Sequence, residues 1–348
     1  MKNMFKTSAI AAALLLAAGA AQAGTVIYNT GSAATAAVAL GVNDDGSLNT
    51  DPNITSNAGA TGLSYQFGGA TASDWRDATA PGCLCEGWGV SVNGTVSGYA
   101  NVDTDGGPNN LTFGAATAVT GSTVTTTTSL TSLPGLVVKQ AYQPSTNAPG
   151  ALFRDHVTIT NTTGAAVSDV KYVRVMDWDV PPTEFDEFVT IKGTASTALL
   201  EESGDNGFNS ANPLATYSNI LGCFNVDCEA SGPEDHGAYF RFNFGSIADG
   251  ASYEFDIFYG AAGGKAAAIA AIAAESIELY SLGQSNSGGS ADNDAPTFIF
   301  GFAGVGGKPI ECGLPGQPPC EVTVPEPATL ALFGLTLAGL GFSRRRKA

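Results

Sequence analysis

Short stretches that alternate apolar and polar residues recur every dozen or so positions along this chain, with Gly, Asn, Asp and Pro between them. Alternation with a period of two is typical of a β-strand with one buried face. The clearest case runs from Val170 to Val180, where Asp177 and Asp179 fall on the same side and Pro181-Pro182 ends the strand. We predict further strands at Leu152 to Thr160, Phe185 to Ile191, Tyr239 to Phe244, Tyr253 to Tyr259 and Thr297 to Phe302.

This pattern predicts an all-β fold, a large two-sheet β-sandwich-like body with one packed helix. Charged residues make up only 14% of the 348 residues, which favours strands joined by turns over long surface helices. We predict the helix from Lys265 to Leu282, between Gly263-Gly264 and Gly283, because its apolar residues share one face at 3.6-residue spacing. The Thr/Ser tract from Ser122 to Ser132 is interpreted as a polar edge strand, with a glycosylated segment as the alternative.

The N-terminus has the parts of a secretion signal. A basic start precedes an apolar run from Ala9 to Ala20, and Ala21-Gln22-Ala23 is the small-x-small pattern of a cleavage site. We predict a signal peptide over residues 1–23, removed by signal peptidase, and export across the inner membrane. A retained membrane helix is the alternative, but about a dozen apolar residues are too few to span ~30 Å of hydrocarbon.

The C-terminus combines a proline motif, an apolar span and a basic stop over residues 324–348. The apolar residues 328–342 form a short predicted transmembrane helix, which rises ~22 Å and relies on snorkelling arginines and local bilayer thinning. Clustered basic residues stay cytoplasmic, so the preceding chain lies across the inner membrane. The stop consists of Arg344, Arg345, Arg346 and Lys347.

This tail, with Pro325, Glu326 and Pro327 as its motif, resembles the PEP-CTERM sorting signal. The resemblance implies recognition by an exosortase, a membrane-embedded cysteine protease that removes the tail as the protein moves to the cell surface or is secreted. It also implies a bacterium that makes exopolysaccharide. A permanent anchor without processing shares every physical feature and is the alternative. Upstream of the tail we predict a Gly/Pro/Cys spacer over 306–323 and a β-rich extracellular body over 24–305.

The chain is acidic, with a formal net charge of −17. Six of its 15 basic residues lie in the two predicted signals, so the body is still more acidic. Such a surface repels phosphate backbones and anionic headgroups, and we expect no nucleic-acid partner. Solubility outside the cell explains the charge, and binding of divalent cations is compatible with it.

Six cysteines in an exported chain predict disulfides, because the periplasm is oxidising. Cys83 and Cys85 lie two positions apart, where a direct bridge is strained and a distant partner is the alternative. A zinc site would need a Cys-x2-Cys pair or more histidine than the chain contains. The other four cysteines are close enough to pair locally, as Cys223 with Cys228 and Cys312 with Cys320.

Two groups of acidic residues raise the hypothesis of structural Ca²⁺. Asn101, Asp103 and Asp105 alternate before a glycine, as in the first half of a calcium loop, but the twelfth position is Thr112 instead of Glu. Solvated turns and a charged sheet face explain both groups as well. The second group comprises Asp177, Asp179, Glu184, Asp186 and Glu187.

No motif of a known catalytic site appears. The two histidines, His156 and His236, are interpreted as surface residues, and Trp88 and Trp178 as core residues. We therefore name no catalytic residue and predict a structural or adhesive protein of the cell surface or extracellular matrix, associated with exopolysaccharide. An exported hydrolase or a carbohydrate-binding module that acts on polysaccharide is the alternative.

Overall fold

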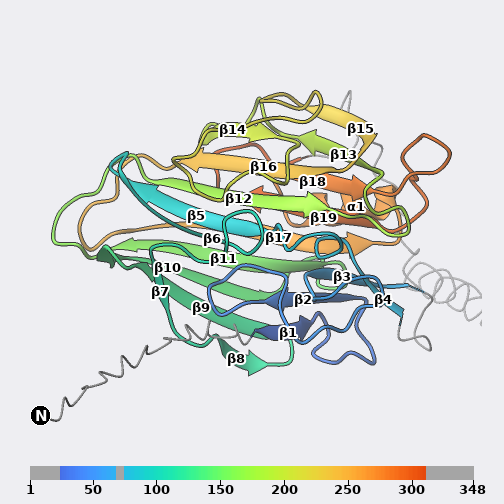
Figure 1. Ribbon diagram of the computed structural model, residues 1–348, viewed down its shortest axis with the longest axis horizontal. Helices are drawn as coiled ribbons and strands as arrows, with labels where there is room; N and C mark the ends of the chain where they lie inside the picture. The colour runs from blue at the N-terminus through green and yellow to red at the C-terminus, as the bar shows by residue number, and fades with distance from the viewer. Residues whose placement is uncertain (1–23, 68–73, 311–348) are drawn as a thin grey trace, which may run out of the picture.

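The computed structural model describes residues 24–67 and 74–310, and these form three antiparallel sheets and one helix (Figure 1). The prediction of an all-β fold is confirmed. The predicted signal peptide, the sorting tail and the pair Cys312 and Cys320 lie outside the described residues.

The largest sheet has ten strands in the order β15-β13-β18-β19-β17-β11-β10-β9-β7, with β8 paired to β9. Figure 1 shows β7 to β9 at its lower edge and β13 and β15 at the opposite one. The strands are β7 (Leu111–Phe113), β8 (Thr117–Thr120), β9 (Thr123–Leu130), β10 (Leu133–Pro144), β11 (Leu152–Asn161), β13 (Glu187–Lys192), β15 (Cys228–Glu234), β17 (Ser252–Ala262), β18 (Leu279–Gln284) and β19 (Thr297–Ala303).

Two smaller sheets complete the molecule. The five-stranded sheet has the order β14-β16-β12-β5-β6, with β5 (Gly87–Val92), β6 (Val96–Asn101), β12 (Lys171–Trp178), β14 (Leu200–Gly204) and β16 (His236–Asn243). The four-stranded sheet has the order β1-β2-β3-β4, with β1 (Thr25–Tyr28), β2 (Val38–Val42), β3 (Leu63–Phe67) and β4 (Asp74–Asp77).

Both smaller sheets pack on the same face of the large sheet. Alternation along β17 and β19 sends Tyr259 and Phe302 into this interface. There Phe302 lies 5.2 Å from Phe240 of the five-stranded sheet, measured between ring centroids. On the side of the four-stranded sheet, Tyr65 lies 6.4 Å from Phe298. A continuous aromatic and aliphatic core therefore fills a two-layer sandwich.

The opposite face of the large sheet carries the helix α1 (Lys265–Ala274), whose Ile269 and Ile272 are buried against it. The predicted helix was too long. It ends at Ala274, Ser276 adopts a left-handed backbone with φ of 55°, and the last predicted residues, from Leu279 on, belong to β18 (Leu279–Gln284). Because β18 pairs with both β13 and β19, its backbone gains two ladders of hydrogen bonds that a longer helix would forfeit.

The predicted strands are present with small shifts at their ends. The Thr/Ser tract forms β9, and the interpretation as an edge strand is wrong, since β9 pairs with β10 on one side and with β7 and β8 on the other. Residues 306–310, predicted to begin the spacer, pack on the body. Ile310 is buried and its backbone N–H donates to the carbonyl of Ile277 at 2.8 Å.

One charged group lies inside the sandwich. Arg174 of β12 is fully buried and donates to the carboxylate of Glu86 and, at 2.8 Å, to Oε1 of Gln140 on β10. Its guanidinium lies 5.3 Å from the ring centroid of Tyr259 on β17. Asp155 of β11 is buried nearby, and this burial raises the pKa of its carboxyl to about 8 despite the attraction of Arg174. The arginine thus ties the five-stranded sheet to the large one.

Candidate functional site

Two connections cross between the sheets at one end of the sandwich. The first leads from β12 to β13 and the second from β15 to β16. Trp178, at the end of β12, pairs with His236, at the start of β16. Glu187, at the start of β13, pairs with Glu234, at the end of β15. Four strand ends therefore meet at this place, and each brings acidic residues with it.

Asp177 and Asp179 are central to this junction. Asp177 follows Val173 and Val175 on the outer face of β12. The chain at Gly207 covers Asp177 closely, because a Cβ atom added to Gly207 would lie only 2.5 Å from the Asp177 Cα. Asp177 is 1% exposed and Asp179 is fully buried. Asp177, Asp179 and Asp235 each place one carboxylate oxygen within 4.8 Å of the oxygens of the other two. We call these three residues the aspartate cluster.

The aspartate cluster has few hydrogen-bond donors. Both oxygens of Asp179, and Oδ1 of Asp177 and of Asp235, are buried without a partner. In the adjacent Glu187, one oxygen accepts from the backbone N–H of His236 at 3.0 Å, and the other has no partner. Within residues 24–67 and 74–310, no lysine or arginine forms an ion pair with any of these four carboxylates. Their negative charge is thus uncompensated by the chain around them.

The environment disfavours the ionised form of each carboxyl. Burial, reinforced by the neighbouring carboxylates, raises the pKa of Asp179 to about 10. Burial raises the pKa of Glu187 to about 9 and that of Asp177 well above its ordinary value. The pKa of Asp235 is raised for the same reason, with the charge of Glu234 adding to it.

His236 lies beside the cluster, and its interpretation as a surface residue is wrong. It is fully buried, and burial lowers the pKa of its imidazole. Both ring nitrogens lack a hydrogen-bond partner, and Nδ1 lies 4.0 Å from Oδ2 of Asp205. The acidic sequence around it suggested a solvated turn, whereas pairing with β12 places it between the sheets. His156 is partly exposed, and its Nδ1 lies 2.8 Å from Oδ1 of Asp256.

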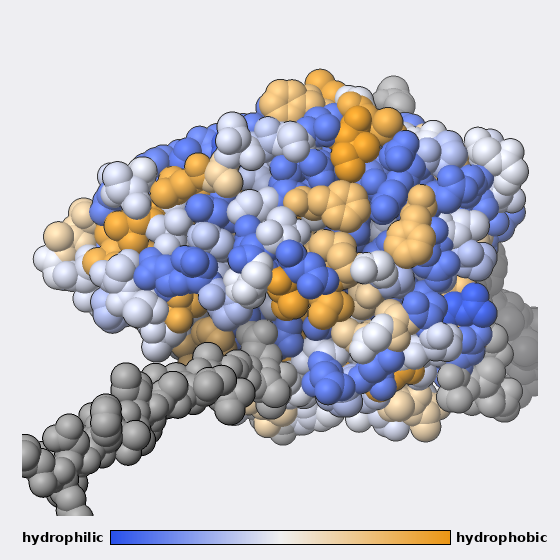
Figure 2. Space-filling model, viewed as in Figure 1, coloured by the Kyte–Doolittle hydropathy of each residue, from blue (hydrophilic) through white to orange (hydrophobic). Residues whose placement is uncertain are grey.

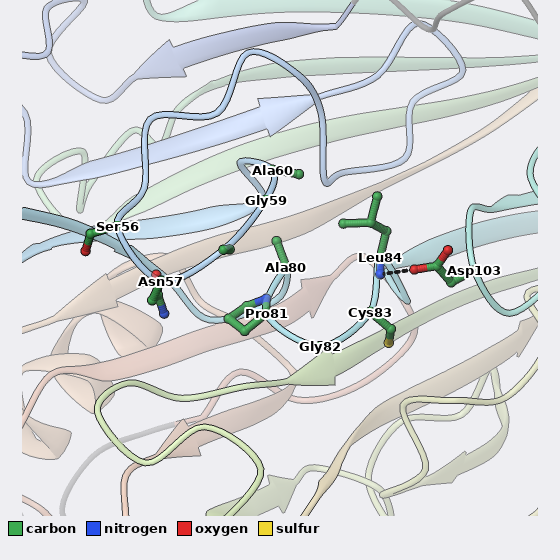
Figure 3. Close-up of a pocket in the computed structure, with 11 residues that line it drawn as sticks. Ser56, Asn57, Gly59, Ala60, Ala80, Pro81, Gly82, Cys83, Leu84 and Asp103 are labelled. Carbon is green, nitrogen blue, oxygen red and sulfur yellow. Dashed lines mark hydrogen bonds between the residues drawn. The ribbon is translucent and has the colours of Figure 1, made fainter.

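The described part of the chain has a surface pocket of about 480 Å³, whose lining residues are drawn in Figure 3. It is lined by residues 56–60 and 80–84 and by Asp103, whose carboxylate accepts from the backbone N–H of Leu84 at 2.6 Å. Cys83 lines the pocket, and its Sγ lies 3.4 Å from Oδ2 of Asp177. The sulfur of a disulfide carries no hydrogen, so this contact does not satisfy the carboxylate. Cys83 thus contacts the aspartate cluster and also lines the pocket.

The first predicted group of calcium ligands is arranged differently. Asp103 holds the Leu84 backbone, and Asp105 accepts from the Ser210 hydroxyl at 2.6 Å. Asn101 is buried, accepts from a backbone N–H in its own loop and donates to the carbonyl of Cys85 at 2.8 Å. The three side chains thus serve as connectors between loops.

The second predicted group is divided by the structure. Asp177, Asp179 and Glu187 come together, whereas Glu184 accepts from Asn57 and Asp186 from Asn286. Sequence reasoning missed Asp235 as a member. Its only signal was its position just before β16, and that signal has meaning only once β16 is known to pair with β12.

The cysteines within the described residues form two local disulfides. Cys223 is joined to Cys228 across the loop before β15. Cys83 is joined to Cys85, so the distant partner considered for these two is not present in the structure. Both bridges close short segments, with the paired cysteines two and five residues apart in the sequence.

Trp88 and Trp178 are fully buried core residues, as predicted. Figure 2 shows apolar residues as separate patches among hydrophilic ones on one face of the molecule. Among the residues that the structure describes, the exposed large apolar side chains are Phe185, Leu214, Leu221, Phe224 and Val226.

In the part of the chain that the structure describes, no helix is long and apolar enough to cross a membrane. The predicted transmembrane segment lies outside that part. The model of the PEP-CTERM protein-sorting motif matches residues 323–347. The chain is therefore an exported protein that is sorted by an exosortase, with a transient C-terminal membrane anchor before processing. Comparison with curated proteins finds no match to this sequence.

Proposed function

We propose that this chain is a structural or adhesive protein of the cell surface or extracellular matrix, placed among exopolysaccharide after both of its end segments are removed. The observation that carries the proposal is the sorting motif at residues 323–347. Signal peptidase removes residues 1–23, the inner membrane holds the segment 328–342, and exosortase cleaves near Pro325-Glu326-Pro327.

The charge and the disulfides of the body suit that environment. An acidic surface keeps the protein soluble and discourages adsorption to anionic lipids. Two local disulfides are compatible with an oxidising compartment.

Among the described residues, neither histidine forms a hydrogen bond with a serine hydroxyl, and the pocket contains a single carboxylate, that of Asp103. The structural or adhesive role is therefore favoured over the exported hydrolase.

The test compares Glu326→Ala with Glu321→Ala, because Glu321 lies just outside the matched motif. The full chain is produced in its bacterial host and traced in inner-membrane, matrix and medium fractions, with the mature mass measured in each. We expect the wild type and Glu321→Ala in the matrix fraction at the mass of a doubly trimmed chain, released by polysaccharide-degrading enzymes. Glu326→Ala should stay in the inner membrane with its tail. A wild type that keeps its tail, or that enters the medium regardless of polysaccharide, would contradict the proposal.

A further inference from the structure

We propose that the aspartate cluster of Asp177, Asp179 and Asp235 binds one divalent cation, with Ca²⁺ as the preferred ion, and that this ion clamps together the two chain crossings. The site is separate from the sorting signal and does not depend on the proposed function.

The distances fit a shared ion. Calcium binds carboxylate oxygens at about 2.4 Å, so two oxygens on one ion are separated by at most about 4.8 Å. Each of the three aspartates offers an oxygen within 4.8 Å of the others. Since the three residues come from β12, from the connection after it and from the connection before β16, one ion would join segments far apart in the sequence.

A second observation points to a ligand. Asp179 is fully buried, yet neither of its oxygens has a hydrogen-bond partner. Buried carboxylates are normally paired with a cation or with several donors, and an ionised one without them costs several kcal/mol. Solvated turns and a charged sheet face, the other explanation of these acidic residues, do not apply to side chains that are buried. A divalent cation supplies the missing partner for all three at once.

The donor set selects the class of ion. Carboxylate oxygens are hard ligands that suit Ca²⁺ and Mg²⁺ better than soft metals. Mg²⁺ demands a near-ideal octahedron with bonds of about 2.0–2.1 Å, whereas Ca²⁺ accepts irregular sets of oxygens at about 2.3–2.6 Å, and oxygens within 4.8 Å of one another match the longer bonds. Zinc prefers nitrogen and sulfur, but both sulfurs nearby, of Cys83 and Cys85, are held in a disulfide. Asp235 is partly exposed and provides the route by which the ion enters.

The experiment uses the full chain, exported and purified from its host, and stripped with a chelator. Calorimetric titration with CaCl₂ and a thermal melt with and without Ca²⁺ measure stoichiometry and stabilisation. We expect one Ca²⁺ per chain, a melting temperature raised by several degrees, and weaker binding of Mg²⁺. Asp179→Asn should lower the affinity about tenfold or more, because affinity depends on ligand charge.

The variants distinguish a binding site from a structural role. Without metal, Asp179→Asn should melt at the same temperature as the wild type or higher, because the substitution removes repulsion between buried carboxylates. Asp235→Asn, at the exposed side, serves as a second variant should Asp179→Asn fail to fold. The matched controls are Asp186→Asn, a neighbouring carboxylate held by Asn286, and Asp103→Asn, in the other predicted loop.

Both controls should bind Ca²⁺ like the wild type. The proposal is overturned if the stripped wild type takes up no stoichiometric Ca²⁺, if Mg²⁺ or Zn²⁺ binds more tightly than Ca²⁺, or if Asp103→Asn removes binding while the cluster variants keep it.

Discussion

Arg174 and Glu86 form a fully buried ion pair, and Arg174 also donates to Gln140 of the large sheet. Both side chains are fully buried, so water cannot solvate either charge if the other is removed. Removing one partner of such a pair leaves an uncompensated charge inside the core. We expect Arg174→Met to lower the free energy of unfolding by about 3–5 kcal/mol, measured by denaturant titration. Arg174→Met with Glu86→Gln should recover part of that loss, because glutamine is neutral and still accepts from the Leu48 backbone N–H.

The control for this pair is Arg76→Met, which breaks the ion pair with Asp74. Both side chains of that pair are 33% exposed, and exposed pairs contribute less than about 1 kcal/mol. If the double variant were as unstable as the sum of its two single substitutions, the coupling between Arg174 and Glu86 would be disproved.

Asp155 gives the core a dependence on pH. Burial raises the pKa of its carboxyl from 3.8 to about 8, so the folded state holds a proton that the unfolded chain releases. The stability that this raised pKa of Asp155 contributes is fully present below about pH 4 and is lost as the pH rises toward 8. We expect Asp155→Asn, which is always neutral, to gain stability relative to the wild type by a few kcal/mol between pH 5 and pH 8.5. Unfolding titrations of both proteins at the two pH values measure this, and a constant difference would refute it.

The sequence predicted the strands well and their pairing partners poorly. The alternation from Val170 to Val180 defines β12 because a strand with two packed faces must place successive side chains on opposite sides. The helix was overextended because Ile277 and Tyr280 continue the helical spacing of α1. Leu279 to Gln284 satisfy a strand equally well, and their pairing with β13 and β19 decided between the two. Such pairing joins residues far apart in the chain and leaves no local pattern.

The same limit applies to the candidate site. The side chains of Asp177 and Asp179 were placed on one side by the period of a strand, and they do come together. Asp235 and the buried His236 could not be assigned, because their surroundings are set by β16 lying against β12. The Asp103 loop had the better local motif, yet its carboxylates hold backbone and hydroxyl groups of neighbouring loops.

For the whole molecule, the two ends of the sequence carried the information on destination and the body carried little on activity. The sorting tail is recognisable because a motif, a span and a basic stop must follow one another in a fixed order. The activity of a β-sandwich depends on side chains that the fold brings together, and one such group, the aspartate cluster, lies at the chain crossings. A site at that junction forms no sequence motif, because its residues come from segments far apart in the chain.

The last residues that the structure describes, up to Ile310, pack on the body. Val305 is fully buried in the main core, and Ile310 is buried beside α1. The backbone N–H of Gly307 donates to Glu278 at 2.8 Å. A mature chain that ends after Gly304 loses both apolar side chains from the core, and each contributes about 1.5–3 kcal/mol when fully buried.

We therefore expect a chain of residues 24–304 to be less stable than one of residues 24–310 by about 3–6 kcal/mol, measured by denaturant unfolding. A chain that ends at Pro327 is the reference, and its free energy of unfolding should match that of 24–310 if the segment between them is a spacer. Equal stability of 24–304 and 24–310 would mean that the contacts of Val305 and Ile310 add nothing. A large gain on extension to Pro327 would instead mean that the spacer is part of the folded body, because only burial of further residues supplies free energy of that size.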